Sequence, residues 1–226
     1  MTEKAMQFQY GDRQLTLSVG NLIDAPVEVI CHATDSALTH ETQHAKTILS
    51  AAGPESLTEC AQLIRQYQSI DSGMAVYTSA GQLPQKALIH VVISDNPDEQ
   101  QALLERSIAR SLMICDTNEW QSIAFHALGV ENGDISLNHC AQAFFRSITS
   151  FWDARLECAV DTVILKLAEH EFETFFHAFR NESMQEDSQI TENPESTHEP
   201  ETAEVNLEDL QTELPNENDE ISDWFK

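Results

Sequence analysis

The sequence predicts an α/β domain in which a largely parallel sheet of about six strands lies between layers of helices. Along residues 1–180, short runs rich in β-branched and other apolar residues alternate with longer stretches whose apolar residues recur at helical spacing. Strands that alternate with helices in this way form mainly parallel sheets covered on both faces. A strongly acidic segment follows at residues 181–226 and is expected to stand apart from this domain.

The predicted strands are apolar runs too short to form helices. Residues 88–93 read Leu-Ile-His-Val-Val-Ile, and such a nearly continuous apolar run is typical of a central strand buried on both faces. His90 within it, and His126 within the apolar run at residues 123–128, are each expected to satisfy one buried hydrogen bond. The predicted strands comprise residues 15–19, 27–33, 75–79, 87–93, 123–128 and 162–167.

The predicted helices lie between and after these strands. In the clearest of them, Leu104, Ile108 and Leu112 recur every four residues and so share one face. Ligands of open α/β sheets bind beyond the carboxyl ends of the strands, so we expect the site in the loops after Ala33 and Leu128. The predicted helices comprise residues 44–52, 55–69, 99–117, 138–155 and 170–180.

The charge of the chain excludes ordinary polyanion binding. Its 226 residues include 38 Asp and Glu against 12 Lys and Arg, for a formal net charge of −26. A protein this acidic repels DNA, RNA and anionic membrane surfaces unless a local basic stripe overrides the field, and the sequence contains no such stripe. We therefore expect neither a nucleic-acid partner nor membrane binding.

Cysteine usage and hydropathy indicate the compartment. The five cysteines lie far apart and form no Cys-x-x-Cys pair, which favours buried thiols in a reducing environment over a disulfide framework or a zinc knuckle. No apolar run approaches the roughly 18 residues that a membrane span needs, and the first residues lack the apolar core of a signal peptide. We expect a soluble, cytoplasmic protein.

The acidic segment is expected to be disordered. Residues 181–226 hold 15 Asp and Glu with a single Lys and few apolar residues, so they cannot bury enough surface to offset the entropy of ordering. Ile221, Trp224 and Phe225 interrupt this composition, and such apolar anchors dock into grooves of partner proteins. We expect this tail to bind a protein partner. The alternatives are that it folds back onto its own domain or only keeps the protein soluble.

Four segments resemble the macro domain family, in the family's order. Residues 20–35 read G-N-L-I-D-A-P-V-E-V-I-C-H-A-T-D, which resembles the opening pattern G-D-I-T-x-x-x-V-D-A-I-V-N-A-A-N. Residues 44–55 resemble its V-A-K-A-I-x-x-A-A-G-P-E helix, and residues 122–133 are similar to its S-I-A-F-P-A-L-G-T-G-x-G segment. The strand and helix over residues 163–179 follow in the right order. The resemblance covers residues 8–180 and implies a three-layer α/β/α fold around a mixed sheet.

Macro domains bind ADP-ribose, and some hydrolyse ADP-ribosyl bonds or related esters. The resemblance therefore implies an ADP-ribose-like small molecule as ligand and a set of ligand-binding positions on the two matching loops. These positions are Asn21, Leu22, His32, Asp35, Gly129, Val130, Asn132 and Gly133.

The chain departs from the family where the ligand would bind. Asn21 stands where the family has the Asp that recognises adenine, and no glycine occupies the phosphate loop, which here reads Glu41-Thr42-Gln43. Glycine lets backbone N–H groups approach a phosphate closely. A carboxylate such as Glu41 or Glu131 about 6 Å from a phosphate charge would cost about 3 kcal/mol at an effective dielectric near 20. We expect weak ADP-ribose binding in a remodelled pocket.

Residues 40–44 read H-E-x-x-H, a pattern that on a helix places two imidazoles on one face for zinc. A zinc ion held by His40 and His44, with His32 as a third ligand, would lie over the end of the preceding strand. Asp35 or Glu41 would then activate a bound water.

The alternative without metal is that His40 and Glu41 form the solvated start of a helix capped by Thr39. A zinc peptidase is disfavoured, because the sequence after residue 44 offers no third zinc ligand at the spacing typical of that class. The catalytic positions of an enzyme would be His32, Asp35 and Glu41. The leading hypothesis is nevertheless a non-catalytic binding or regulatory protein without a cofactor, and the second is a metal-assisted hydrolase of ADP-ribosyl or related nucleotide esters.

Overall fold

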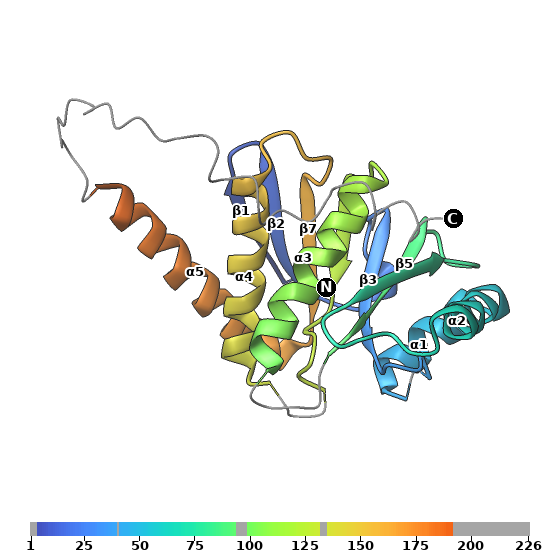
Figure 1. The fold of residues 1–226 in the computed structure, drawn as a ribbon. Coiled ribbons are helices and arrows are strands. Elements are labelled where there is room, and N and C mark those ends of the chain that lie inside the picture. The colour runs from blue at the N-terminus through green and yellow to red at the C-terminus, as the bar shows by residue number, and fades with distance from the viewer. Residues whose placement is uncertain (1–3, 40, 94–98, 132–134, 192–226) are drawn as a thin grey trace, which may run out of the picture. The chain divides into compact units, whose positions relative to one another are not determined.

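The computed structural model describes residues 4–39, 41–93, 99–131 and 135–191. These residues form a seven-stranded sheet and five α-helices (Figure 1). The strands are β1 Ala5–Tyr10, β2 Arg13–Val19, β3 Val29–Thr34, β4 Ala75–Ser79, β5 Ala87–Val92, β6 Ser122–Phe125 and β7 Thr162–Leu167. The helices are α1 Gln43–Ala52, α2 Pro54–Tyr67, α3 Gln100–Thr117, α4 Leu137–Ala154 and α5 Glu169–Thr191, and a short 3₁₀ helix lies at Leu22–Asp24.

The sheet is mixed, with a parallel centre and antiparallel edges. The strand order is β1-β2-β7-β6-β3-β5-β4, in which β2, β7, β6, β3 and β5 run parallel while β1 and β4 pair antiparallel with their neighbours. The predicted α/β class and mainly parallel sheet are confirmed. The expected number of strands was one too low. The additional strand β1 reads Ala-Met-Gln-Phe-Gln-Tyr and lies largely exposed at the sheet edge, and its alternation of apolar residues with glutamine, which is typical of a half-buried strand, was not among the predicted strands.

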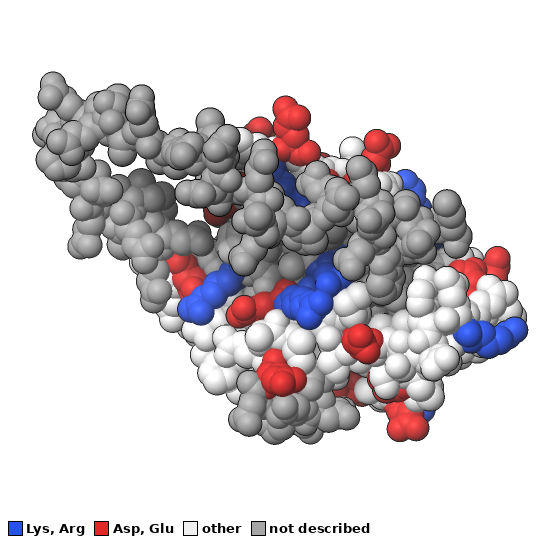
Figure 2. All heavy atoms as spheres, viewed as in Figure 1, with Lys and Arg blue, Asp and Glu red and all other residues white. Residues whose placement is uncertain are grey.

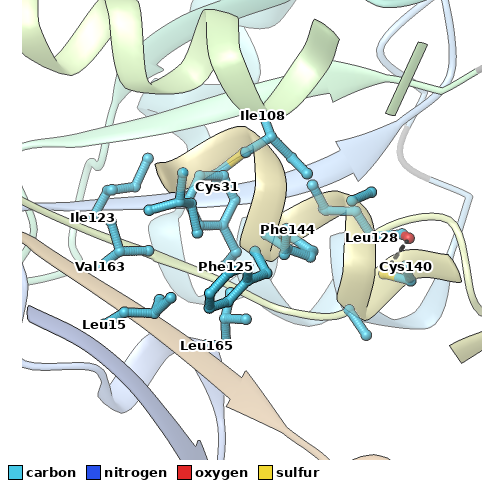
Figure 3. Packing of buried hydrophobic residues seen from close by; sticks show 14 of the residues in the cluster. Leu15, Cys31, Ile108, Ile123, Phe125, Leu128, Cys140, Phe144, Val163 and Leu165 are labelled. Atoms are coloured by element: carbon cyan, nitrogen blue, oxygen red, sulfur yellow. Dashed lines mark hydrogen bonds between the residues drawn. The ribbon is translucent and has the colours of Figure 1, made fainter. Parts of the chain in front are cut away.

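The larger core lies between the sheet and helices α3, α4 and α5. Alternate residues of the central strands point to this side, as the period of two along a strand requires, and Figure 3 shows Cys31, Phe125 and Leu165 among them. Phe125 meets Phe144 of α4 edge to face, with ring centroids 5.3 Å apart. The Cys140 thiol donates to the Leu128 carbonyl at 3.3 Å, so α4 is fixed to the loop that follows β6.

A smaller core covers the opposite face of the sheet. Ile30, Leu88 and Ala124 point to this side and pack against Ile48 and Leu49 of α1. Gln43 and His44 in the first turn of α1 lie beside the residues that follow β2, β6 and β7, so this turn is at the carboxyl ends of these strands. The sheet and α1 together therefore frame the region in which the sequence predicts a site.

Four predicted helices agree with the structure to within two residues, and the fifth is longer. The helix expected over residues 170–180 is α5, which runs to Thr191. The predicted partner-binding residues Ile221, Trp224 and Phe225 lie outside the described residues.

The described surface carries charges of both signs. In Figure 2, Lys and Arg side chains lie in several separate places with Asp and Glu beside them, and they form no continuous basic stripe on the described part of that face. Among the described residues, no helix has both the length and the hydrophobicity that a membrane span requires.

Candidate functional site

A cavity of about 420 Å³ opens at the carboxyl ends of β2, β6 and β7, beside the first turns of α1. This volume lies within the range of small-molecule sites, roughly 300–1,000 Å³. Its wall combines segments from across the chain: residues 19–23 after β2, Gln43, His44, Thr47 and Ile48 of α1, His126 and Ala127 after β6, and Lys166, Leu167, Ala168 and Glu171 around the end of β7.

Two predicted ligand-binding residues lie on this wall. Asn21 and Leu22 follow β2 and begin the 3₁₀ helix; Leu22 is buried, and the Asn21 side-chain amide donates to Asp24 at 3.3 Å. That bond uses the amide nitrogen and leaves the Asn21 carbonyl oxygen as an acceptor toward a ligand. The cavity therefore lies beside the segment that follows β2, whereas the loops after Ala33 and Leu128, in which the site was expected, supply none of the described residues that line it.

The amino end of α1 contacts a carboxylate from a loop that is distant in the sequence, that of Glu131. Oε1 of Glu131 accepts hydrogen bonds from the backbone N–H groups of Gln43, at 2.8 Å, and of His44, at 3.4 Å. Oε2 of Glu131 lies 3.2 Å from Nδ1 of His44. Thr42 supplies the cap itself, because its hydroxyl accepts from the N–H of Ala45 at 3.2 Å. A negative charge at this position is favourable, since the amino end of a helix carries a partial positive charge.

Glu131 is held as the ionised form. Partial burial raises the pKa of Glu131, but hydrogen bonds from the His44 side chain, the Gln43 backbone and the Thr42 side chain outweigh burial and bring that pKa below its ordinary value. The cavity wall at α1 is therefore next to a fixed negative charge.

His44 also stacks on a buried imidazole. The rings of His44 and His126 are nearly parallel, at 11°, with centroids 4.7 Å apart. Burial, together with the charge of the neighbouring His44, lowers the pKa of His126 to about 3. Nε2 of His126 accepts from the N–H of Ala33 at 3.4 Å, which agrees with a neutral ring. Reasoning from the sequence treated His126 as an ordinary core histidine and missed its place on the cavity wall.

His32 does not line the cavity. Its ring is fully buried, and Nε2 lies 2.8 Å from Nδ1 of His90, whose Nε2 in turn lies 2.9 Å from the Thr78 hydroxyl. Cys60 of α2 contacts the same nitrogen of His90 at 3.7 Å. His32 thus belongs to a polar cluster under α2, because its position in β3 turns it toward that helix. The prediction of a ligand or catalytic role for His32 finds no support in this placement.

Asp35 holds the turn that follows β3. Its carboxylate accepts from the N–H of Ala37, at 2.8 Å, and from the N–H of Thr39, at 3.0 and 3.1 Å, and the Thr39 hydroxyl donates to it as well. Partial burial raises the pKa of Asp35, but these hydrogen bonds outweigh it and lower that pKa overall. A carboxylate with so many donors is a weak base, and Asp35 does not line the cavity.

The H-E-x-x-H segment does not lie on one helix. Helix α1 begins at Gln43, so Glu41 precedes it and only His44 belongs to it; His40 lies outside the described residues. The expected cap at Thr39 was wrong, because Thr42 caps the helix. Among the described residues, no three His, Cys, Asp or Glu side chains are grouped as a metal site. Zinc binding through His40 and His44 remains a prediction.

The loop after β6 depends on one glycine. Gly129 has φ +73°, and a Cβ atom there would lie 2.6 Å from Cδ1 of Ile135. Gly129 and Val130 are not on the wall of the cavity, and Asn132 and Gly133 lie outside the described residues, so the ligand-binding role of all four stays a prediction.

Lys166 was also missed. It lies on the cavity wall near the end of β7 and is only 8% exposed. The sequence signal that could have identified it is a lysine within the mainly apolar strand Thr-Val-Ile-Leu-Lys-Leu. A buried lysine of this kind is rare outside functional or paired positions.

Comparison with known proteins agrees with this architecture. A family model described as the Macro domain matches residues 31–144. An O-acetyl-ADP-ribose deacetylase of Klebsiella pneumoniae is 31% identical over 136 residues, which cover 59% of this chain and 78% of that protein. The corresponding protein of Escherichia fergusonii is 36% identical over 112 residues, which cover 48% of this chain and 63% of that protein. The human protein mono-ADP-ribosyltransferase PARP14 is 25% identical over 172 residues, or 74% of this chain, but these are only 10% of its own length.

Solved structures show the same fold. A macrodomain of Oceanobacillus iheyensis with ADP has a TM-score of 0.74 at 22% identity, covering 82% of this chain and 100% of that chain. A Trypanosoma brucei macrodomain in complex with ADP-ribose has a TM-score of 0.63 at 21% identity, covering 71% and 67%.

Proposed function

Because the chain belongs to the macro domain family, we propose that its cavity binds the nucleoside part of an ADP-ribose-type ligand and that the domain acts as a binding module. The observation that carries this proposal is the cavity itself, about 420 Å³ in volume at the carboxyl ends of the parallel strands. Leu22, Ile48 and Leu167 offer apolar surface for a base or a ribose, while Asn21 offers a carbonyl acceptor beside them.

One imidazole on the cavity wall is unsuited to hydrolysis and supports a role in binding. A general base must reach the proton that it removes with an available lone pair. Nε2 of His126 already accepts from the Ala33 backbone, so this ring has no such lone pair to offer a ligand in the cavity. The contacts of His44 and Glu171 involve only Nδ1 and Oε2 and do not decide between binding and hydrolysis.

Titration calorimetry with adenosine and with ADP-ribose tests the proposal. The variant Thr47→Trp places a large ring at the exposed position of α1 that lines the cavity, and we expect it to weaken binding at least tenfold. Thr58→Trp on α2 is a matched control, because both threonines are exposed and both donate their hydroxyl to the carbonyl four residues earlier, at 2.9 and 2.8 Å. Equal binding by both variants and the wild type would contradict a ligand in this cavity.

The bacterial relatives are O-acetyl-ADP-ribose deacetylases, and this activity favours a second candidate, a hydrolase of O-acetyl-ADP-ribose or a related ester. Its metal-assisted form would use zinc at His40 and His44. Elemental analysis of the purified protein and of His44→Ala separates the two: a stoichiometric zinc content that His44→Ala removes, together with ester hydrolysis, supports the hydrolase. Hydrolysis without zinc would support an enzyme of the relatives' kind and would overturn the binding module.

The acidic tail is proposed to bind a protein partner through Ile221, Trp224 and Phe225. The support is compositional, since these apolar residues stand within a segment of high negative charge that would attract a basic surface. Deletion of residues 221–226 should abolish retention of the partner in a pull-down, while Glu217→Gln with the anchor intact should retain it. A partner that binds both forms equally would remove the anchor from the proposal.

A further inference from the structure

Glu131 occupies the position at which the cavity would otherwise attract a negatively charged group. Gln43 and His44 form part of the cavity wall, and their backbone N–H groups are the donors at the amino end of α1. Such donors, together with the partial positive charge of the helix end, bind phosphates and carboxylates. In this chain both N–H groups already point to Oε1 of Glu131.

The carboxylate is fixed in this position from several sides. One oxygen accepts the two backbone N–H groups, and the other contacts Nδ1 of His44 at 3.2 Å. The Glu131 side chain is only 27% exposed, so solvent screens its charge incompletely. A ligand phosphate that approached the amino end of α1 would lose the donors and would also face a negative charge.

We infer that Glu131 determines the charge specificity of the cavity: it acts as an internal anion that disfavours ligands with a phosphate at the amino end of α1 and favours uncharged nucleosides. This inference rests on the proposed function, because it concerns the same cavity. It adds the class of ligand, a nucleoside or a nucleoside derivative whose group at the amino end of α1 is uncharged. It also names Glu131 as the residue that selects this class.

The test replaces the charge while keeping the shape. In Glu131→Gln the side-chain oxygen can still accept from the N–H groups of Gln43 and His44, but the negative charge is gone. Glu55→Gln is the matched control, because Glu55 lies in the first turn of the neighbouring helix α2, is exposed and does not line the cavity. Circular dichroism and thermal unfolding of each variant verify that the fold is retained.

Calorimetry with adenosine and with ADP-ribose gives two affinities for each of the three proteins, the wild type, Glu131→Gln and Glu55→Gln. We expect Glu131→Gln to bind ADP-ribose at least tenfold more tightly than the wild type and adenosine within twofold of it, and Glu55→Gln to change both affinities by less than twofold. Tighter ADP-ribose binding in Glu55→Gln as well would show an effect of net charge and overturn the role of Glu131. If the wild type bound ADP-ribose as tightly as Glu131→Gln does, the role of Glu131 would likewise be overturned.

The outcomes separate this inference from the proposed function. Adenosine binding by the wild type without a selective gain for ADP-ribose in Glu131→Gln refutes the specificity role and leaves the binding module standing. No binding of either ligand by any of the three proteins refutes the nucleoside cavity itself, and with it the inference.

Discussion

His126 stacks face to face on His44, with ring centroids 4.7 Å apart, and so joins the buried end of β6 to the exposed start of α1. His44 in turn contacts Glu131 through Nδ1. Two imidazoles on the cavity wall and a carboxylate next to it thus come from three separate segments of the chain. The pKa of His126 and that of Glu131 are both lowered in the folded protein, so pH-dependent unfolding measures what these two groups contribute to stability.

Acid should destabilise the protein through His126. Its folded-state pKa of about 3 lies below the ordinary value of 6.5, so the unfolded chain takes up a proton at this residue before the folded protein does. The stability that the neutral ring contributes is present above pH 6.5 and is lost as the pH falls from there toward 3. The slope from this single group approaches about 1.4 kcal/mol per pH unit in the free energy of unfolding.

Urea unfolding at several pH values between 7 and 4 measures this slope. His126→Asn removes the titrating group, and we expect its pH dependence to be shallower than that of the wild type by the same amount. Proton NMR gives an independent measurement in the wild type. A His126 ring signal that titrates near pH 6.5 in the folded protein would contradict the prediction.

Glu131→Gln should lower the stability of the domain at neutral pH by about 0.5–1 kcal/mol, since it removes a negative charge from a helix start, where such a charge is favourable. The pKa of this carboxyl is held below its ordinary value, so the contribution is present above the unfolded-state pKa and is lost as the pH falls through the folded-state pKa. The difference in unfolding free energy between wild type and variant should therefore shrink in acid. A difference that is constant from pH 7 to pH 3 would speak against the charge as its cause.

Gly129→Ala should cost about 1–3 kcal/mol in unfolding free energy, because it combines a left-handed backbone with a contact that is too close. The new methyl group would meet Cδ1 of Ile135 at 2.6 Å. Gly11→Ala is the control: Gly11 has a similar φ of +58°, but nothing lies within 4 Å of the added atom. Thermal unfolding of the two variants isolates the contact with Ile135, and an equal loss in both would show that the loop after β6 is not tightly packed at this point.

Thr42→Ala should destabilise the protein by about 1 kcal/mol, the usual cost of losing a helix cap. The hydroxyl of Thr42 accepts from the N–H of Ala45 at 3.2 Å. Thr42→Ser keeps the acceptor and should retain most of the stability. A Thr42→Ala variant as stable as the wild type would mean that Glu131 alone suffices to hold the start of α1.

The central strands could be predicted because their own residues carry the signal. Residues 88–93 are apolar almost throughout, and burial on both faces leaves that pattern in any sequence. The edge strand β1 was missed although it alternates glutamine with apolar residues, which is the local signal of a half-buried strand. Its pairing with β2, which places it at the sheet edge, could not be predicted from its own composition.

The site could be predicted only as far as the loops that form it. Asn21 and Leu22, which the family resemblance implies as ligand-binding positions, line the cavity, and their ligand-binding role stays a prediction. The contact between Glu131 and Gln43 joins residues far apart in the chain, so their spacing carries no local signal. For His32, the side of β3 on which it lies decides its surroundings, and there it meets His90 and the helix α2 instead of the cavity.

The pairing of β2 with β7 places Leu15 opposite Val163 and Leu17 opposite Leu165, so the hairpin formed by the first two strands has no parallel neighbour until the last strand exists. During synthesis on the ribosome, this amino-terminal hairpin must wait for nearly the whole domain to emerge. An isolated two-stranded hairpin is marginally stable in water, and long-range closure of this kind slows folding. A nascent chain that ends before Thr162 therefore exposes an apolar hairpin, which is the kind of surface that chaperones bind.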